Sequence, residues 1–150
     1  MVKLAQGLDE LGYERYWIAE HHNAPNLVSS ATALLIQHTL EHTERIKVGS
    51  GGIMLPNHAP LIVAEQFGTM ETLFPHRVDL GLGRAPGTDM MTASALRRDQ
   101  HNGVYQFPEE VEQLEKYFGP GNQQAYVSAN TALSKNLPHY ILGTTTDSAD

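Results

Sequence analysis

Hydrophobic residues gather along this chain in short runs, which are separated by longer stretches of mixed character. Four runs are rich in branched and aromatic residues and have the length of buried strands: residues 16–19, 46–53, 78–82 and 139–142. The first three recur about every 31 residues, and the stretches between them have helical spacing. This rhythm predicts βαβ units and therefore an α/β fold built on a parallel sheet.

Helix signals flank these runs. The chain opens on a helical stripe of leucines that Gly12 is placed to end. Ser29 or Ser30 can cap a second helix, and Pro60 occupies the first turn of a third. After the third strand the rhythm breaks, because a polar and weakly patterned stretch follows. A fourth helix is expected only at residues 107–117.

The length, charge and composition of the chain limit the classes of protein to which it can belong. A chain of 150 residues with 41% hydrophobic residues supports one globular unit, whereas a complete (β/α)₈ barrel typically takes about 250 residues. The net charge of −7 disfavours contact with nucleic acid. The absence of cysteine excludes disulfides, iron–sulfur clusters and thiolate-bound zinc. We find neither an apolar run of about 18 residues nor a leader of the signal-peptide type, so we expect no membrane contact and a cytoplasmic location.

Candidate site residues directly follow the predicted strands. In parallel α/β folds ligands bind at the carboxyl ends of the strands. An imidazole there can move protons, paired glycines let a flat ring approach the backbone, an arginine offers a fixed cation, and hydroxyl groups suit phosphate. The residues concerned are Glu20, His21, His22, Gly51, Gly52, Arg84, Thr144, Thr145 and Thr146.

Each candidate also has a purely structural interpretation. The histidines can be hydrogen-bonded strand-end residues, the glycine pair a tight bend, Arg84 a surface ion pair and the threonines a frayed end. The functional interpretation gains weight because all of them fall at the same end of successive strands.

Two further patterns suggest a dinucleotide-binding site and a metal site. The glycines at residues 81–87 suggest a dinucleotide-binding turn, but the third glycine comes one position late and Pro86 precedes any helix, so a Rossmann site is rejected. His38 and His42 lie four residues apart on one helical face, a spacing compatible with zinc. Glu41 is misplaced for a metalloprotease motif and no acidic or thiol third ligand is evident, so no metal site is predicted.

The motifs at residues 16–22, 48–60, 64–67 and 77–87 closely resemble the bacterial luciferase-like flavin-dependent monooxygenases, and among them the group-1 luciferase-like oxidoreductases. The resemblance implies a (β/α)₈ TIM barrel. Residues 1–150 would then be a single fragment, the N-terminal half of that domain, lacking the first strand and the C-terminal strands. It does not imply light emission, since Gly83 stands where luciferase has a reactive cysteine.

The resemblance also implies a cofactor and residue roles. Reduced FMN, supplied by a separate flavin reductase, would react with O₂ and a small organic substrate. His21 matches the catalytic histidine, and Gly51 and Gly52 match the site of a non-proline cis peptide beneath the flavin ring. Arg84 matches a flavin-contacting arginine, and Thr144 and Thr145 fall in the loop near the FMN phosphate.

His22 and Glu65 match a pair that meets across the luciferase dimer interface, so a homodimer or higher oligomer is expected through the second and third helices. Two alternative functions stay open. One is a non-catalytic, oligomerising assembly subunit, and the other is a dehydrogenase that uses the deazaflavin F420. The substrate is not readable from the sequence.

Overall fold

The computed structural model describes residues 1–85, 88–96 and 106–143. It contains a five-stranded sheet whose pairings are all parallel. The strands are β1 (Arg15–Ile18), β2 (Lys47–Ser50), β3 (Ile53–Met54), β4 (Val78–Gly83) and β5 (His139–Leu142). The α-helices are α1 (Val2–Glu10), α2 (Thr32–Glu41), α3 (Pro60–Leu73), α4 (Met90–Leu96) and α5 (Phe107–Phe118). Three short 3₁₀ turns are η1 (Leu55–Asn57), η3 (Pro120–Gln124) and η4 (Asn130–Ala132).

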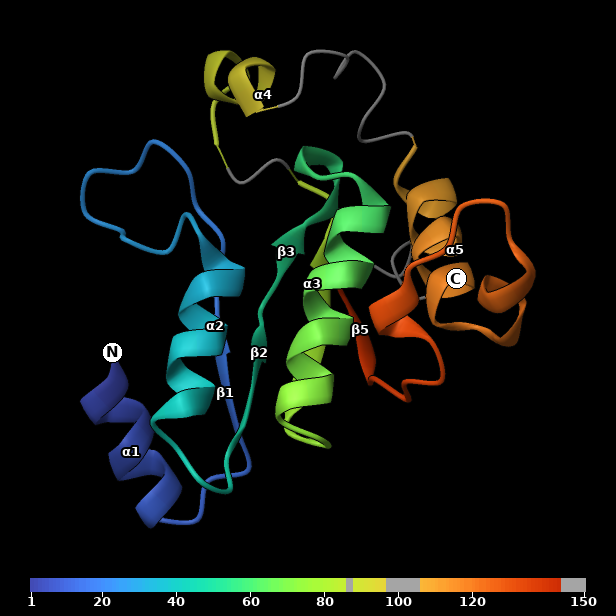
Figure 1. Ribbon diagram of the computed structural model, residues 1–150. Helices are drawn as coiled ribbons and strands as arrows, with labels where there is room; N and C mark the ends of the chain where they lie inside the picture. Colours follow the sequence, from blue (N-terminus) through green and yellow to red (C-terminus); the bar gives the residue numbers. More distant parts are fainter. Residues whose placement is uncertain (86–87, 97–105, 144–150) are drawn as a thin grey trace.

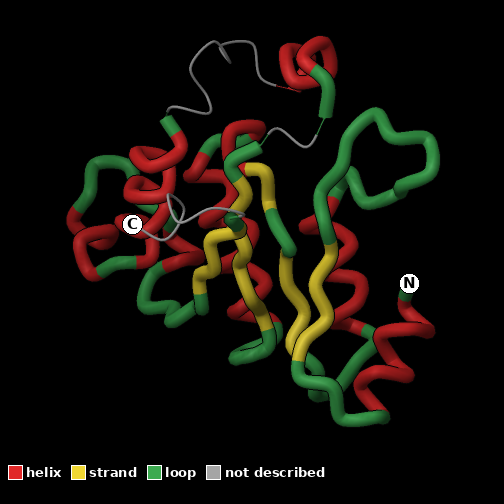
Figure 2. The backbone as a smooth tube through the Cα atoms, turned by 180° about the vertical axis from the view of Figure 1, so that it is seen from behind, coloured by secondary structure: helices red, strands yellow, loops and turns green. Residues whose placement is uncertain are grey.

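Helices α2 and α3 cover one face of the sheet (Figure 1). Figure 2, seen from behind, shows the strands in front of these helices. Strand β1 pairs with β2, and β4 pairs with β2 and β3 on one side and with β5 on the other. Successive parallel strands that lie side by side and are joined by helices have the order of a (β/α)₈ barrel, so the predicted α/β class and parallel sheet are confirmed.

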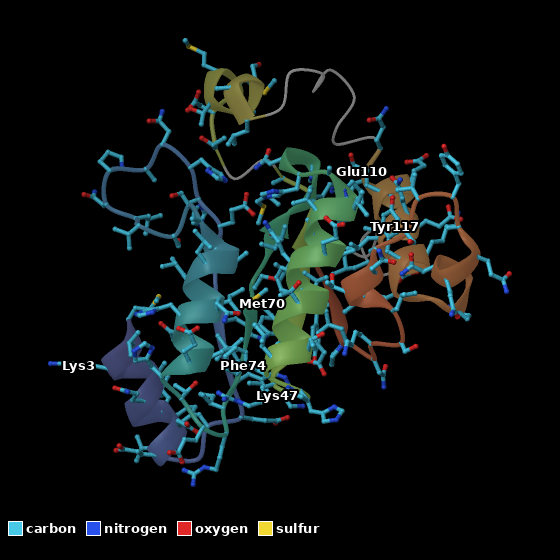
Figure 3. All side chains as sticks on the ribbon, viewed as in Figure 1. Lys3, Lys47, Met70, Phe74, Glu110 and Tyr117 are labelled. Carbon is cyan, nitrogen blue, oxygen red and sulfur yellow. The ribbon has the colours of Figure 1, made fainter. Side chains whose placement is uncertain are left out.

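The core lies between the sheet and the helices. Alternate strand residues point toward α2, α3 and α5, as the two-residue period of a strand requires. The largest fully buried side chains of this core include Ile36, Leu40, Val48, Val63, Phe67, Val78, Leu80, Leu82 and Leu114. Helix α5 turns a stripe that contains Glu110 and Tyr117 toward α3 (Figure 3). Pro60 begins α3 as predicted.

The opposite face of the sheet carries polar and aromatic side chains. Asp79 is fully buried, and its Oδ2 accepts hydrogen bonds from Trp17 Nε1 (3.0 Å) and Arg15 Nε (3.1 Å). The Trp17 ring meets the Tyr140 ring edge to face at 4.8 Å. Gly49 lies against Asp79 so closely that a Cβ at this position would come within 2.3 Å of the Asp79 carbonyl oxygen. Only glycine fits there.

The predicted strand at residues 46–53 is interrupted. Val48 and Gly49 pair with Val78 and Asp79, and Ile53 then pairs with Leu82. Three residues, 50–52, therefore lie opposite two residues of β4, 80 and 81, which is the arrangement of a β-bulge. The peptide bond between Gly51 and Gly52, inside this bulge, is cis. The hydrophobic pattern of the sequence does not reveal one extra residue, so a single strand was expected where the chain forms β2 and β3.

Two helix predictions were wrong. Helix α2 has Ala31 at its N-cap position and no side-chain cap, so neither Ser29 nor Ser30 caps it. Helix α4 lies in the polar stretch where no element was predicted. Asp89 starts α4, because its Oδ1 accepts hydrogen bonds from the backbone N–H groups of Met91 and Thr92, at 3.0 Å each. No helix among the described residues is long and apolar enough to cross a membrane.

Candidate functional site

The predicted site residues lie at one end of the sheet. His21 comes just after β1, Gly51 and Gly52 follow β2, and Arg84 follows β4. Since these strands run parallel, His21 and Arg84 lie at the carboxyl end of the sheet, and Gly51 and Gly52 lie in the bulge beside the end of β1, opposite residues 80 and 81 of β4. His21 and Gly51 are partly exposed and Arg84 is exposed, so their groups are accessible there. Thr144 and Thr145 lie outside the described residues.

The glycine pair is tightly enclosed by its neighbours. The Gly51 N–H donates to the Ile18 carbonyl (2.9 Å), which fixes the bulge against β1. A Cβ on Gly51 would lie 3.1 Å from Trp17 Cβ, and a Cβ on Gly52 would lie 2.5 Å from Leu142 Cδ1. Side chains at these positions would therefore crowd Trp17 and Leu142, and the partly exposed backbone of Gly51 fits the approach of a planar ring.

A buried carboxylate organises the carboxyl end of the sheet. Glu20 is 1% exposed, and its Oε1 accepts hydrogen bonds from His22 Nε2 (2.7 Å) and His58 Nε2 (2.9 Å). Its Oε2 accepts a hydrogen bond from the Met54 N–H (2.9 Å). Burial by itself would raise the pKa of the Glu20 carboxyl, but hydrogen bonds from His58, His22 and Met54 outweigh burial and lower that pKa. Glu20 thus joins the end of β1 to the segment that follows the cis peptide.

Sequence reasoning placed Glu20 in a motif without giving it a role, and it missed His58. Their contact joins residues 38 positions apart. No local pattern marks such a pair, because helical and strand periodicity extend over only a few residues. The available signal was a glutamate directly after a buried strand, where an unpaired charge is costly.

His22 has a partner within its own chain. Its side chain is 13% exposed and bonded to Glu20. Glu65 lies on α3 and lines a groove of about 350 Å³ between α2 and α3, together with Leu34, Met70 and Leu73. Figure 3 shows Met70 between these helices. Among the described residues, no hydrogen bond joins His22 to Glu65.

The loops after β1 and β4 meet above this end of the sheet. Thr88 Oγ1 donates to the His22 carbonyl (3.0 Å), and Asn23 Nδ2 donates to Asp89 Oδ2 (3.3 Å). Hydrogen bonds from Thr92 and Asn23 lower the pKa of the Asp89 carboxyl, so Asp89 stays an acceptor at neutral pH. The position of the loop that carries His21 and His22 is therefore linked to the start of α4.

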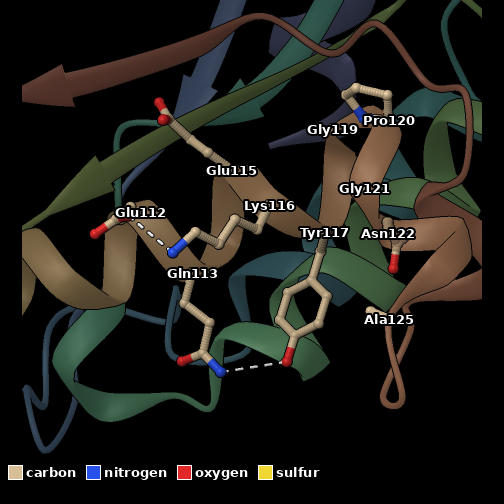
Figure 4. Close-up of a pocket in the computed structure, with 10 residues that line it drawn as sticks. All are labelled: Glu112, Gln113, Glu115, Lys116, Tyr117, Gly119, Pro120, Gly121, Asn122 and Ala125. Carbon is tan, nitrogen blue, oxygen red and sulfur yellow. Dashed lines mark hydrogen bonds and ion pairs between the residues drawn. The ribbon is translucent and has the colours of Figure 1, made fainter.

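A larger pocket, of about 570 Å³, lies on α5 and the turn after it (Figure 4). Its lining includes Lys116, which pairs with Glu112 at 2.8 Å, and Tyr117, whose hydroxyl accepts a hydrogen bond from Gln113. None of the predicted site residues that the structure describes lines it. The carboxyl end of the sheet is therefore the better candidate for the functional site.

Two curated relatives align with almost the whole of this chain. The uncharacterized protein YddN of Bacillus subtilis (strain 168) is 54% identical over 149 residues, which cover 99% of this chain and 44% of that protein. A luciferase-like monooxygenase of Escherichia coli (strain K12) is 44% identical over 146 residues, covering 97% of this chain and 44% of that protein. The chain thus spans about 44% of the length of these curated relatives.

Solved structures agree on the fold. The crystal structure of apo-MsnO8 matches with a TM-score of 0.90 at 36% identity, covering 99% of this chain and 44% of that chain. More distant matches share the fold alone. They include the oxygenating constituent of 3,6-diketocamphane monooxygenase from Pseudomonas putida in complex with FMN (TM-score 0.73, 20% identity, 98% of this chain and 46% of that chain). Another is an F420-dependent secondary alcohol dehydrogenase (TM-score 0.74, 17% identity, 95% of this chain and 47% of that chain). The described sheet is accordingly part of a TIM barrel.

The model of the luciferase-like monooxygenase family matches residues 1–129. This range includes β1 to β4 and the predicted site residues His21, Gly51, Gly52 and Arg84. The chain belongs to the family of luciferase-like monooxygenases.

Proposed function

We propose that this protein is an FMN-dependent monooxygenase that uses reduced flavin and O₂ to oxygenate a small organic substrate. The observation that carries the proposal is the placement of an imidazole, a glycine pair and a guanidinium at one end of a parallel sheet in a member of this family. The FMN complex of a protein with the same fold supports the choice of cofactor. A flavin reductase would be the partner that supplies reduced FMN.

Each residue has a distinct task in this proposal. The backbone at Gly51 and Gly52 would contact one face of the flavin ring, and the exposed Arg84 guanidinium would balance negative charge on the reduced ring. His21 would hold or move a proton next to the reacting atoms. Thr144 and Thr145 would bind the phosphate. Reduced FMN, when bound, supplies the electrons that activate O₂.

The test is a titration of the purified chain with oxidised FMN and, under anaerobic conditions, with reduced FMN, followed by flavin absorbance. Gly51→Ala should weaken binding at least about tenfold, because its Cβ would lie 3.1 Å from Trp17 Cβ and would displace the backbone that the ring is proposed to contact. Gly7→Ala is the matched control, since a Cβ at Gly7 meets nothing within 4 Å. If the chain binds neither form of FMN, it does not itself act as the flavin-binding unit.

A second candidate is a dehydrogenase that uses F420, which the fold match to an F420-dependent secondary alcohol dehydrogenase favours. The two cofactors have different absorbance maxima, and F420 transfers a hydride without consuming O₂. Parallel titrations with FMN and F420 separate the proposals. Tighter binding of F420, with no O₂ uptake, would replace the monooxygenase proposal.

We also propose a homodimer formed through α2 and α3. The groove between these helices is lined by Leu34 and Leu73, whose exposed fractions are 72% and 58%. Such exposed apolar side chains favour contact with another subunit. Glu65 in this groove would then meet the partner subunit near His22, and Glu20 would hold the His22 ring in place.

Sedimentation analysis of the wild-type chain and of Leu34→Glu tests the dimer. Leu34→Glu should give a monomer, whereas Leu11→Glu, at a leucine of similar exposure (78%) at the C-cap of α1, should leave the assembly unchanged. A stable dimer that binds no flavin in either state would favour the third candidate, a non-catalytic assembly subunit.

A further inference from the structure

Three possible metal ligands cluster at the C-terminal end of α2. His38, Glu41 and His42 are all exposed, and their candidate ligand atoms lie within 4.8 Å of one another. The two imidazole rings are 4.4 Å apart between centroids. The sequence suggested the histidine pair but no acidic third partner. The structure supplies one, because the end of the helix brings the Glu41 carboxylate beside both rings.

The His42 ring is already in the tautomer that a metal ligand needs. Its Nδ1 lies 2.7 Å from the His38 carbonyl oxygen, and a carbonyl oxygen only accepts hydrogen bonds. Nδ1 therefore carries the hydrogen in the neutral ring, and the lone pair is on Nε2. Histidine ligands in metal sites commonly donate their second ring nitrogen to a backbone carbonyl in this way, which orients the ring.

The surroundings favour a cation. The last carbonyl groups of α2 carry partial negative charge, and the chain has a net charge of −7. Gln37 Nε2 donates to Glu41 Oε1 (3.2 Å), which holds the carboxylate on this side of the helix. Bonds of about 2.0–2.1 Å in a tetrahedral site put the ligand atoms about 3.3 Å apart. Exposed side chains can close the remaining gap by rotating.

We propose that His38, Glu41 and His42 form a surface site for a divalent transition-metal ion, with water completing the coordination. Two imidazoles and one carboxylate suit zinc and its neighbours better than magnesium or calcium, which prefer oxygen ligands alone. Helix α2 ends where the chain returns to the start of β2, so the site lies at the opposite end of the sheet from the proposed flavin site. It is independent of the proposed function.

A bound ion would link successive turns at the end of α2 and stabilise the folded chain, because the unfolded chain does not hold the three ligands together. The experiment is calorimetric titration of the untagged chain with zinc chloride, together with thermal unfolding with and without zinc. We expect one ion per chain and a higher unfolding temperature in zinc. A chain that binds no zinc would overturn the proposal.

Three variants locate the ion. His38→Ala and His42→Ala should each weaken zinc binding at least about tenfold and abolish the thermal shift, and Glu41→Gln should weaken binding less. His76→Asn is the control, because His76 is another exposed histidine (side chain 90% exposed) and asparagine tolerates its φ of 65°. Circular dichroism verifies that each variant is folded. Equal zinc affinity in wild type and His38→Ala, or in wild type and Glu41→Gln, would contradict this set of three ligands.

Discussion

The two ends of the sheet use buried charge differently. At the amino end, two charged side chains hold the turn before β2. The Asp9 carboxylate accepts hydrogen bonds from the N–H groups of Glu44 (2.7 Å) and Ile46 (2.9 Å). The Arg77 guanidinium donates to the carbonyls of Thr43 (2.8 Å) and Ile46 (3.0 Å). At the carboxyl end, the Glu20 carboxylate instead holds two imidazoles and one backbone N–H.

This difference indicates that the amino end of the sheet stabilises the fold, whereas the carboxyl end holds groups suited to chemistry. Asp9 and Arg77 bind backbone groups, whose protonation does not change, so the amino end serves to hold α1, α2 and β4 together. An imidazole can donate or accept a hydrogen bond through its ring nitrogens, and Glu20 ties two imidazoles to the segment after the cis peptide. In barrels of this type conservation at the amino end reflects stability, whereas the carboxyl end carries the reaction.

The largest expected effect is at the amino end. Asp9→Ala leaves the N–H groups of Glu44, Arg45 and Ile46 without their acceptor and should lower the free energy of unfolding by about 3 kcal/mol. Denaturant unfolding measures this value. Glu10→Ala, at the exposed neighbouring position of α1, is the control and should change it little. A loss below about 1 kcal/mol would mean that water replaces Asp9 without difficulty.

Glu20→Gln should have the next largest effect, about 2 kcal/mol, since an amide cannot accept hydrogen bonds from both imidazoles and the Met54 N–H at once. We also expect weaker flavin binding, because the segment after the bulge loses its anchor. Glu14→Gln, whose side chain is 72% exposed beside the start of β1, serves as control. Loss of stability with unchanged flavin affinity would make Glu20 purely structural and would remove the contrast between the two ends.

Acid should weaken both ends. The pKa of Glu20 is lowered from 4.5 and that of Asp9 from 3.8, in each case because hydrogen bonds to the carboxylate outweigh burial, which raises the pKa. The resulting stabilisation is fully present at pH values above the ordinary pKa of each carboxyl and is lost as the pH falls through its lowered pKa. Denaturant midpoints at a series of pH values below 4.5 should therefore fall more steeply for wild type than for Glu20→Gln. Parallel curves would show that Glu20 does not contribute.

Local patterns predicted what depends on local geometry. The runs that became β1, β4 and β5, and Pro60 at the start of α3, were readable because period and turn chemistry act within a few residues. The shared location of His21, the glycine pair and Arg84 followed from parallel strands. The bulge and the Glu20 contacts were not readable, because the bulge is a single extra residue in register and the Glu20 contacts join residues brought together by the packed fold. Glu41 lies beside His38 and His42 through the spacing of a single helix, so the sequence already contained the third side chain that its interpretation overlooked.

Arg84→Ala is expected to change stability least. The side chain is exposed just after β4, and replacing a surface residue of this kind typically changes the free energy of unfolding by less than about 0.5 kcal/mol. Affinity for reduced FMN should nevertheless fall about tenfold, as the charge facing the ring is removed. Arg45→Ala, an arginine with a side chain 70% exposed at the amino end, should leave flavin affinity unchanged. If both variants bind flavin as wild type does, charge at the carboxyl end plays no part in binding, and the contrast between the two ends depends on Glu20 and the imidazoles alone.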